Sequence, residues 1–66
     1  MEIVLNGQSK SLDGPLNVAG LVESLGFAGK RIAVERNGEI VPRSAYAQTM
    51  IVPGDRLEIV VAVGGG

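Results

Sequence analysis

Apolar residues recur along this chain with two different spacings, and each spacing predicts a different element. Between residues 17 and 26 the spacing is i, i+3, i+4 and i+7, which is that of one face of an α-helix. The residues with this spacing are Val18, Leu21, Val22 and Leu25. Asn17 is a suitable N-cap and Gly26 a suitable left-handed residue after the last turn, so we expect one helix between them.

Most of the other apolar residues alternate with polar ones, as they do in half-buried strands. We expect strands at residues 2–6, 8–12, 31–36, 39–41, 49–52 and 56–63. An Asn-Gly pair at 6–7 and another at 37–38 each predict a tight hairpin turn. A single helical turn capped by Ser44 is expected at residues 44–47. The last strand is expected to turn one face to the core, through Leu57, Ile59, Val61 and Val63.

The order of these elements is hairpin, helix, hairpin, short turn and final strand. Short connections and a right-handed crossover then give a ββαββ arrangement, in which one helix covers one face of a mixed sheet. This is an α+β fold of the ubiquitin-like β-grasp type, with the first and last strands as central neighbours. We expect a β-grasp domain at residues 1–63 and a flexible glycine tail at residues 64–66.

Composition supports a compact aliphatic core and removes several classes of partner. The chain has 66 residues, of which 45% are hydrophobic, which is enough apolar surface to make disorder unlikely for a single small domain. Its six basic and seven acidic residues give a net charge of −1 without charge runs, so we expect neither nucleic acid nor a membrane surface as partner. The amino terminus lacks a basic region and a cleavage site, and we expect a cytoplasmic protein.

The chain contains no cysteine and no histidine. Thiolate nucleophiles, imidazole bases, Ser-His-Asp triads and the common zinc sites are therefore excluded within this chain. No close pair of carboxylates suggests a general acid and base. We expect no catalytic residue, no bound metal and no enzyme activity of the chain by itself.

The last three residues, Gly64, Gly65 and Gly66, offer the remaining chemistry. Glycine contributes no packing and loses the most entropy when it is ordered, so a fold gains nothing from this ending. A frayed end or an expression scar is one interpretation. The other is that the α-carboxylate of Gly66 is the functional group, presented by the rest of the chain, with Gly65 as its necessary neighbour and Gly64 supplying reach.

Three segments together resemble a known family. Residues 33–43 read Ala-Val-Glu-Arg-Asn-Gly-Glu-Ile-Val-Pro-Arg, Gly54-Asp55 precedes the last strand, and Val63-Gly64-Gly65-Gly66 ends the chain. A small β-grasp domain with these features resembles the ThiS family, the ubiquitin-like sulfur carriers of bacterial thiamine biosynthesis. The resemblance covers the whole chain, and the third glycine is a variation that leaves the last two in place.

The resemblance implies that Gly66 is the site of covalent modification. In the family, an adenylating enzyme of the ThiF type uses ATP and magnesium to form a glycyl adenylate at the C-terminus. A persulfide sulfur donor then converts it to a thiocarboxylate, the 1-thioglycine form. Thiazole synthase, of the ThiG type, receives the sulfur for the thiazole ring. The carrier itself binds no cofactor in this scheme.

Other functions share parts of this pattern. A carrier for molybdopterin synthesis of the MoaD type, a tRNA-thiolation carrier or a ubiquitin-like modifier would use the same tail with another acceptor. A β-grasp binding module would use no tail chemistry at all. The Asn-Gly-Glu-Ile-Val-Pro-Arg segment favours the thiamine carriers.

Surface residues add weaker predictions. Val60 and Ala62 fall on the face of the last strand opposite the core set, and with Val4 nearby they are candidates for a partner-docking patch. The alternative is that they are covered or are ordinary surface aliphatics. Tyr46 is expected to fill the core beneath the short turn. Arg43 and Arg56 are candidates for guiding a partner, although scattered arginines are usually only solvated.

Overall fold

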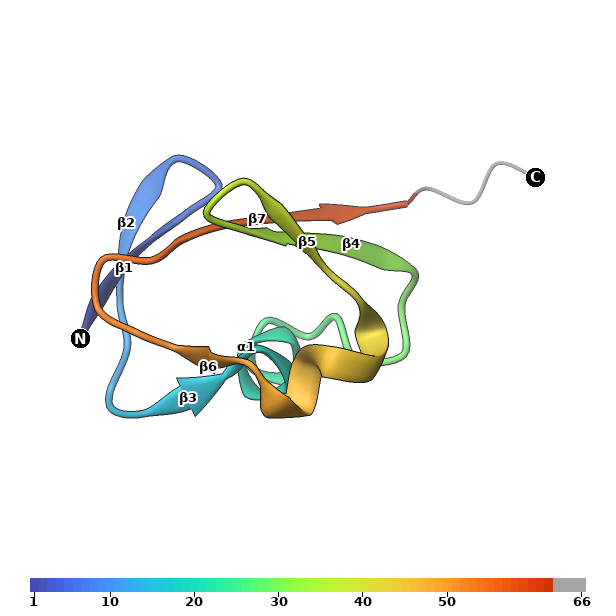
Figure 1. Ribbon diagram of the computed structural model, residues 1–66, viewed down its shortest axis with the longest axis horizontal. Helices are drawn as coiled ribbons and strands as arrows, with labels where there is room; N and C mark the ends of the chain where they lie inside the picture. The colour runs from blue at the N-terminus through green and yellow to red at the C-terminus, as the bar shows by residue number, and fades with distance from the viewer. Residues whose placement is uncertain (63–66) are drawn as a thin grey trace.

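The computed structural model describes residues 1–62 and consists of a five-stranded mixed sheet with a second layer on one of its faces (Figure 1). The large sheet has the order β2-β1-β7-β4-β5. Its strands are β1 (Glu2–Leu5), β2 (Gln8–Ser11), β4 (Ile32–Arg36), β5 (Glu39–Val41) and β7 (Arg56–Val61). The second layer holds β3 (Leu16–Asn17), α1 (Val18–Ser24), the 3-10 helix η1 (Arg43–Gln48) and β6 (Met50–Ile51).

The strand pairing confirms the β-grasp prediction. β1 and β7 are parallel neighbours near the middle of the sheet, whereas β1–β2, β4–β5 and β4–β7 are antiparallel. Both predicted hairpins form, and Asn6 and Asn37 have φ of 50° and 52°, followed by glycines at 82° and 85°. Positive φ at both central positions is the type I′ geometry that matches the twist of antiparallel strands.

The helix begins and ends where its sequence signals predict. The Asn17 side-chain oxygen accepts a hydrogen bond from the Gly20 amide at 2.7 Å, so Asn17 is the N-cap. Gly26 has φ of 80°, and its amide donates to the Glu23 carbonyl while the Phe27 amide donates to the Val22 carbonyl. This pair of bonds is the Schellman ending, which satisfies carbonyls that the last turn leaves free.

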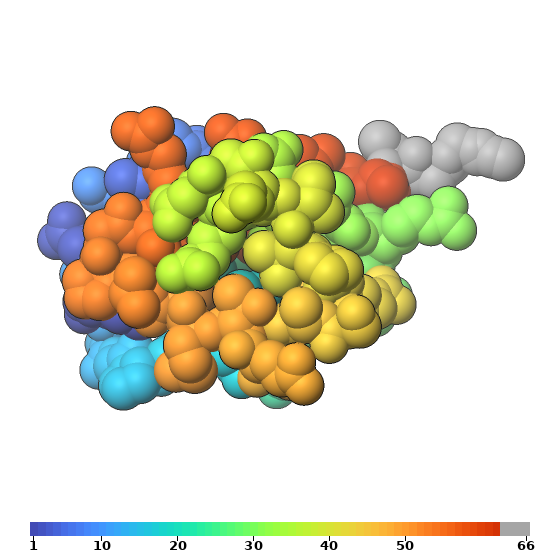
Figure 2. All heavy atoms as spheres, in the orientation of Figure 1, coloured from blue at the N-terminus to red at the C-terminus, as the bar shows by residue number. Residues whose placement is uncertain are grey.

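One core lies between the sheet and the second layer. Its buried residues are Ile3, Val18, Leu21, Val22, Val34, Val41, Ile51, Leu57 and Ile59. The helix stripe and the inward face of β7 are thus confirmed as core, although Leu25 is only half-buried. In Figure 2, η1 (yellow) and the segment leading to β7 (orange) pack beneath the β4–β5 hairpin and cover this side of the core. Tyr46 on η1 is half-buried and packs against the core, as predicted.

Three local features differ from what the sequence led us to expect. η1 follows directly from Pro42, which occupies the N-cap position without a side-chain hydrogen bond; Ser44 therefore lies inside the first turn and caps nothing. β3 was not expected, because two residues paired with β6 are too short to show a period. Val61 ends β7 and is 38% exposed, while Val63 lies outside the described residues.

Candidate functional site

The predicted modification site, Gly66 with Gly65 and Gly64, lies outside the described residues, as does the boundary at Val63. The described part of the site is β7, the strand that precedes them. β7 is flanked by β1 on one side and by β4 on the other. Three sets of contacts hold it, one near its start, one in its middle and one at its end.

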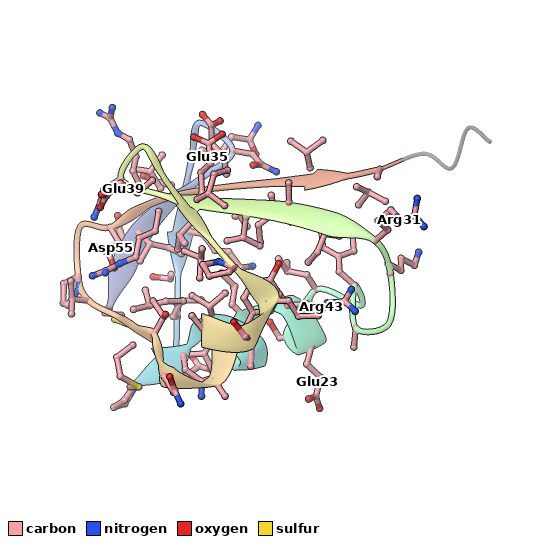
Figure 3. The ribbon with its side chains drawn as sticks, turned by 45° about the vertical axis from the view of Figure 1, so that its right-hand side comes forward. Glu23, Arg31, Glu35, Glu39, Arg43 and Asp55 are labelled. Atoms are coloured by element: carbon pink, nitrogen blue, oxygen red, sulfur yellow. The ribbon has the colours of Figure 1, made fainter. Side chains whose placement is uncertain are left out.

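The start of β7 is held by Asp55, a carboxylate that is only 4% exposed. One of its oxygens accepts from Arg36 Nε at 2.8 Å and from the Val52 amide at 2.9 Å. The other accepts from Asn37 Nδ2 at 3.1 Å and from Arg36 Nη2 at 3.4 Å. The Asn37 side chain in turn accepts from the Arg56 amide at 2.9 Å. Asp55 therefore joins the turn before β7 to the β4–β5 hairpin. Figure 3 shows Asp55 at this place, below the hairpin.

The pKa of Asp55 reflects this environment. Burial alone raises the pKa of the carboxyl, because it penalises the charged form. The hydrogen bonds from Arg36, Val52 and Asn37, with the charge of Arg36, outweigh burial, and the pKa lies below its ordinary value. Asp55 is thus a charged structural anchor whose lone pairs are already used, which leaves it no free site for a ligand.

The middle of β7 is held by Asn6, at the turn that ends β1. Its amide Nδ2 donates to the Ile59 carbonyl at 3.3 Å, and its Oδ1 accepts from the Ile59 amide at 2.8 Å. The side chain therefore continues the pairing of β1 with β7 by one residue after the β1 backbone has turned away. The sequence indicated Asn6 only as a turn residue, and no local signal pointed to this second role.

The end of β7 is held on one side by β4. Val61 pairs with Ile32, and the Ala62 amide donates to the Arg31 carbonyl at 2.8 Å. Arg43 Nη2 donates to the Lys30 carbonyl at 3.2 Å, which links η1 to the same loop. The pairing with β1, by contrast, ends at Leu5 with Leu57. The last described residues therefore project beyond β1 on a strand that remains paired to β4.

The outer face of the sheet, opposite the helix, carries the predicted docking residues. Val60 is 62% exposed and Ala62 is also exposed. Val4 shares this face, but it pairs with Arg56, four residues before Val60 and therefore roughly 13 Å away along the strand. The nearer apolar neighbour of Val60 is the exposed Ala33, its partner on β4.

Three further residues on this face were not predicted as site residues. Glu35 on β4 lies directly opposite Glu58 on β7, and Glu35 also pairs with Ile40 on β5. Ile40 is 66% exposed. Figure 3 shows Glu35 on the outer face of the sheet, away from the helix. Alternation along a strand gives no register between strands, so no sequence signal indicated that these side chains meet.

Within residues 1–62, no group of three or more His, Cys, Asp or Glu side chains is arranged to hold a metal ion. Over the same residues, no helix has the length and apolar character needed to cross a membrane. Arg43 and Arg56 are both exposed, and the side-chain hydrogen bond of Arg43 connects η1 to the loop before β4.

Comparison with known proteins places the chain in a family. The ThiS family model matches residues 3–66. A crystal structure of a thiamine biosynthesis protein (ThiS) from Geobacter metallireducens is 36% identical, with a TM-score of 0.85 and complete coverage of both chains. A solution structure of a thiamine biosynthesis protein from the same organism has a TM-score of 0.83 and 36% identity, and the match covers all of this chain and 88% of that one.

Longer proteins also contain a region like this chain. It is 46% identical over all its 66 residues to a thiazole synthase of Paramagnetospirillum magneticum and 38% identical to a thiazole synthase of Magnetococcus marinus. The chain spans about a fifth of the length of these two relatives, since the match covers 20% of each. An uncharacterised protein, ycf40, of Porphyra purpurea is 35% identical, and 93% of its length is covered.

The family model reaches from β1 to the last residue, and the fold is shared along the whole length of a solved ThiS structure. The chain therefore belongs to the ThiS family.

Proposed function

We propose that the chain carries sulfur as a thiocarboxylate on Gly66 and delivers it to thiazole synthase. The observation that carries this proposal is the match to the ThiS family model, which runs through Gly66. The absence of cysteine and histidine supports it, because the chain has no side-chain thiol to hold the sulfur. The solved ThiS relative favours thiazole formation over the molybdopterin, tRNA-thiolation and binding-module alternatives.

The chemistry proceeds in partner enzymes. A carboxylate is a poor acyl donor because its oxygen is a poor leaving group, so an adenylating enzyme of the ThiF type uses ATP with magnesium to form the Gly66 acyl adenylate and releases pyrophosphate. A persulfide sulfur attacks the acyl carbon and AMP leaves. A second thiol then cleaves the acyl disulfide, which leaves the thiocarboxylate on the chain and a disulfide on the donor side. The carrier contributes the acyl group and no catalytic side chain.

Thiazole synthase is the proposed recipient. Two relatives with that name contain a region that matches all 66 residues of this chain. A protein of that name joined to such a region supports thiazole synthase as a partner of this chain. We place part of the docking contact at Val60 and Ala62, since both are exposed on the strand that leads to the tail. Val4 shares the face but lies toward its other end.

The test is modification of the full chain in vitro. The chain is incubated with ATP, magnesium, a ThiF-type enzyme and a persulfide donor, and intact mass is measured. We expect an increase equal to the exchange of one oxygen for one sulfur, located at Gly66 by fragmentation. A chain lacking Gly66 is expected to remain unmodified at an unchanged thermal midpoint.

A matched control is Gly14→Ala, because nothing lies within 4 Å of an added Cβ at Gly14 and its φ is not positive. This variant should be modified like the parent chain. An unmodified parent chain, or sulfur found at another residue, would refute the proposed function. Loss of folding on removal of Gly66 would show that the tail is structural.

A further inference from the structure

The outer face of the large sheet carries a patch of mixed chemistry that the proposed tail reaction does not use. Across β7, β4 and β5, Glu58, Glu35 and Ile40 lie in register as one row. In the next row toward the tail, Val60 lies opposite Ala33. We call these five residues the outer-face patch. No described element covers it, since α1, η1 and the small sheet all lie on the other face (Figure 1).

The two glutamates are an unfavourable pair for folding alone. Like charges directly opposite each other on neighbouring antiparallel strands destabilise a sheet. Among the described residues, the one ion pair within 4.0 Å is Arg36 with Asp55, so neither Glu35 nor Glu58 has a cationic partner. Arg56 lines the same shallow hollow as the two glutamates but forms no ion pair with them. In the described structure, therefore, no ion pair neutralises the two like charges that the β4–β7 register brings together.

The apolar members of the patch are also exposed. Ile40, beside Glu35 in the same row, is 66% exposed, and Val60, two residues after Glu58 on β7, is 62% exposed. Val60 is followed by Val61 and Ala62, the last described residues before the tail. The patch is therefore continuous with the base of the tail, where a partner that admits the tail must approach.

We propose that the outer-face patch docks an arginine side chain of thiazole synthase between the carboxylates of Glu35 and Glu58. This inference rests on the proposed function and specifies its partner surface. A guanidinium offers donors in a fixed fork that suits two carboxylates at once, and its planar face and aliphatic stem suit exposed Val60 and Ile40. Bringing this cation between the glutamates relieves the repulsion present in the free chain, so charge complementarity favours the bound state.

The most informative variant is Glu58→Lys, because it should weaken binding to thiazole synthase without lowering the stability of the free chain. It replaces the like-charge pair by an opposite-charge pair with Glu35, so we expect the thermal midpoint of the free chain to stay level or rise. Binding to thiazole synthase, measured by calorimetry or surface plasmon resonance, should weaken by about tenfold or more, and its dependence on salt should decrease.

Glu23→Lys is the control with the same change in charge. Glu23 is exposed on α1, and Figure 3 shows it pointing away from the sheet on the opposite side of the molecule. We expect this variant to bind thiazole synthase like the parent chain. Equal affinity of Glu58→Lys and Glu23→Lys for thiazole synthase would overturn the proposal. It would also be overturned if Glu58→Lys weakened binding to the adenylating enzyme but not to thiazole synthase.

The failure of this inference differs from the failure of the proposed function. Sulfur loading of Gly66 is measured by mass in the parent and in both variants. If the parent chain is loaded with sulfur and Glu58→Lys leaves the affinity for thiazole synthase unchanged, the proposed docking surface is refuted but the carrier function is not. If the parent chain is never loaded at Gly66, the proposed carrier function itself is refuted.

Discussion

Replacement of Asp55 by alanine tests how the base of β7 is held. Asp55 accepts hydrogen bonds from the Val52 amide, Asn37 Nδ2 and two nitrogens of Arg36. A buried donor left without an acceptor costs about 1–3 kcal/mol, and a hydrogen bond to a charged group contributes about 1.5–3 kcal/mol. Arg36 is 31% and Val52 46% exposed, and Asn37 is exposed too, so water can solvate part of each donor in the variant, and each share lies toward the lower end of that range.

The expected loss is therefore about 3 kcal/mol in the free energy of unfolding. A domain of this length has a total stability of roughly 3–10 kcal/mol, so the change removes a large fraction of it. The thermal midpoint should fall by about 10–25 °C, since 1 kcal/mol corresponds to about 4–8 °C in a small domain. Urea unfolding followed by circular dichroism measures the free energy directly.

Asp13→Ala is the matched control, because Asp13 is exposed and forms no side-chain hydrogen bond in the described structure. We expect it to unfold within about 0.5 kcal/mol of the parent chain. Asp55→Asn should fall between the two, since an amide keeps one acceptor oxygen but turns a donor toward other donors. If Asp55→Ala were as stable as Asp13→Ala, the network would not be what fixes the start of β7.

Two further predictions concern pH and the middle of β7. Because the pKa of Asp55 is lowered in the folded state, its contribution is complete above the unfolded-state pKa of about 3.9 and is lost as pH falls through the folded value. The difference in unfolding free energy between the parent and Asp55→Asn should therefore shrink below about pH 4 in urea titrations; a constant difference down to acid pH would contradict this reasoning. Asn6→Gly keeps the positive φ of the turn but removes both side-chain bonds to Ile59, so we expect a loss of about 1–2 kcal/mol and faster amide exchange at Ile59. Unchanged exchange at Ile59 would show that the Asn6 amide does not hold the strand.

Local patterns explain why so much of the fold was predictable. The helix from Val18 to Ser24 follows from a stripe of apolar residues and two end signals, all within one short segment. The hairpin turns follow from Asn-Gly pairs, which adopt positive φ at low cost. Once these elements are in order, chain connectivity and handedness leave few arrangements, and β1 beside β7 is among them.

For the candidate site, the sequence alone supports a prediction of the chemistry, and the residues that would carry it lie outside the described structure. The lack of cysteine and histidine pointed to the Gly66 carboxylate, and alternation placed Val60 and Ala62 on the face opposite the core. The same alternation grouped Val4 with them, although strand register separates Val4 from Val60 along the sheet. A period of two assigns a face to each residue, but it says nothing about which residues of neighbouring strands meet.

The sequence by itself therefore determined most of the elements and their order, because these depend on neighbouring residues; that the Gly66 carboxylate is the functional group stays a prediction. Tertiary structure alone decided that Glu35 meets Glu58, that the Asn6 amide pairs with Ile59, and that Asp55 binds Arg36. The partners in these contacts are 19 to 53 residues apart. Their meeting depends on the register set by the packed core, which no local preference encodes.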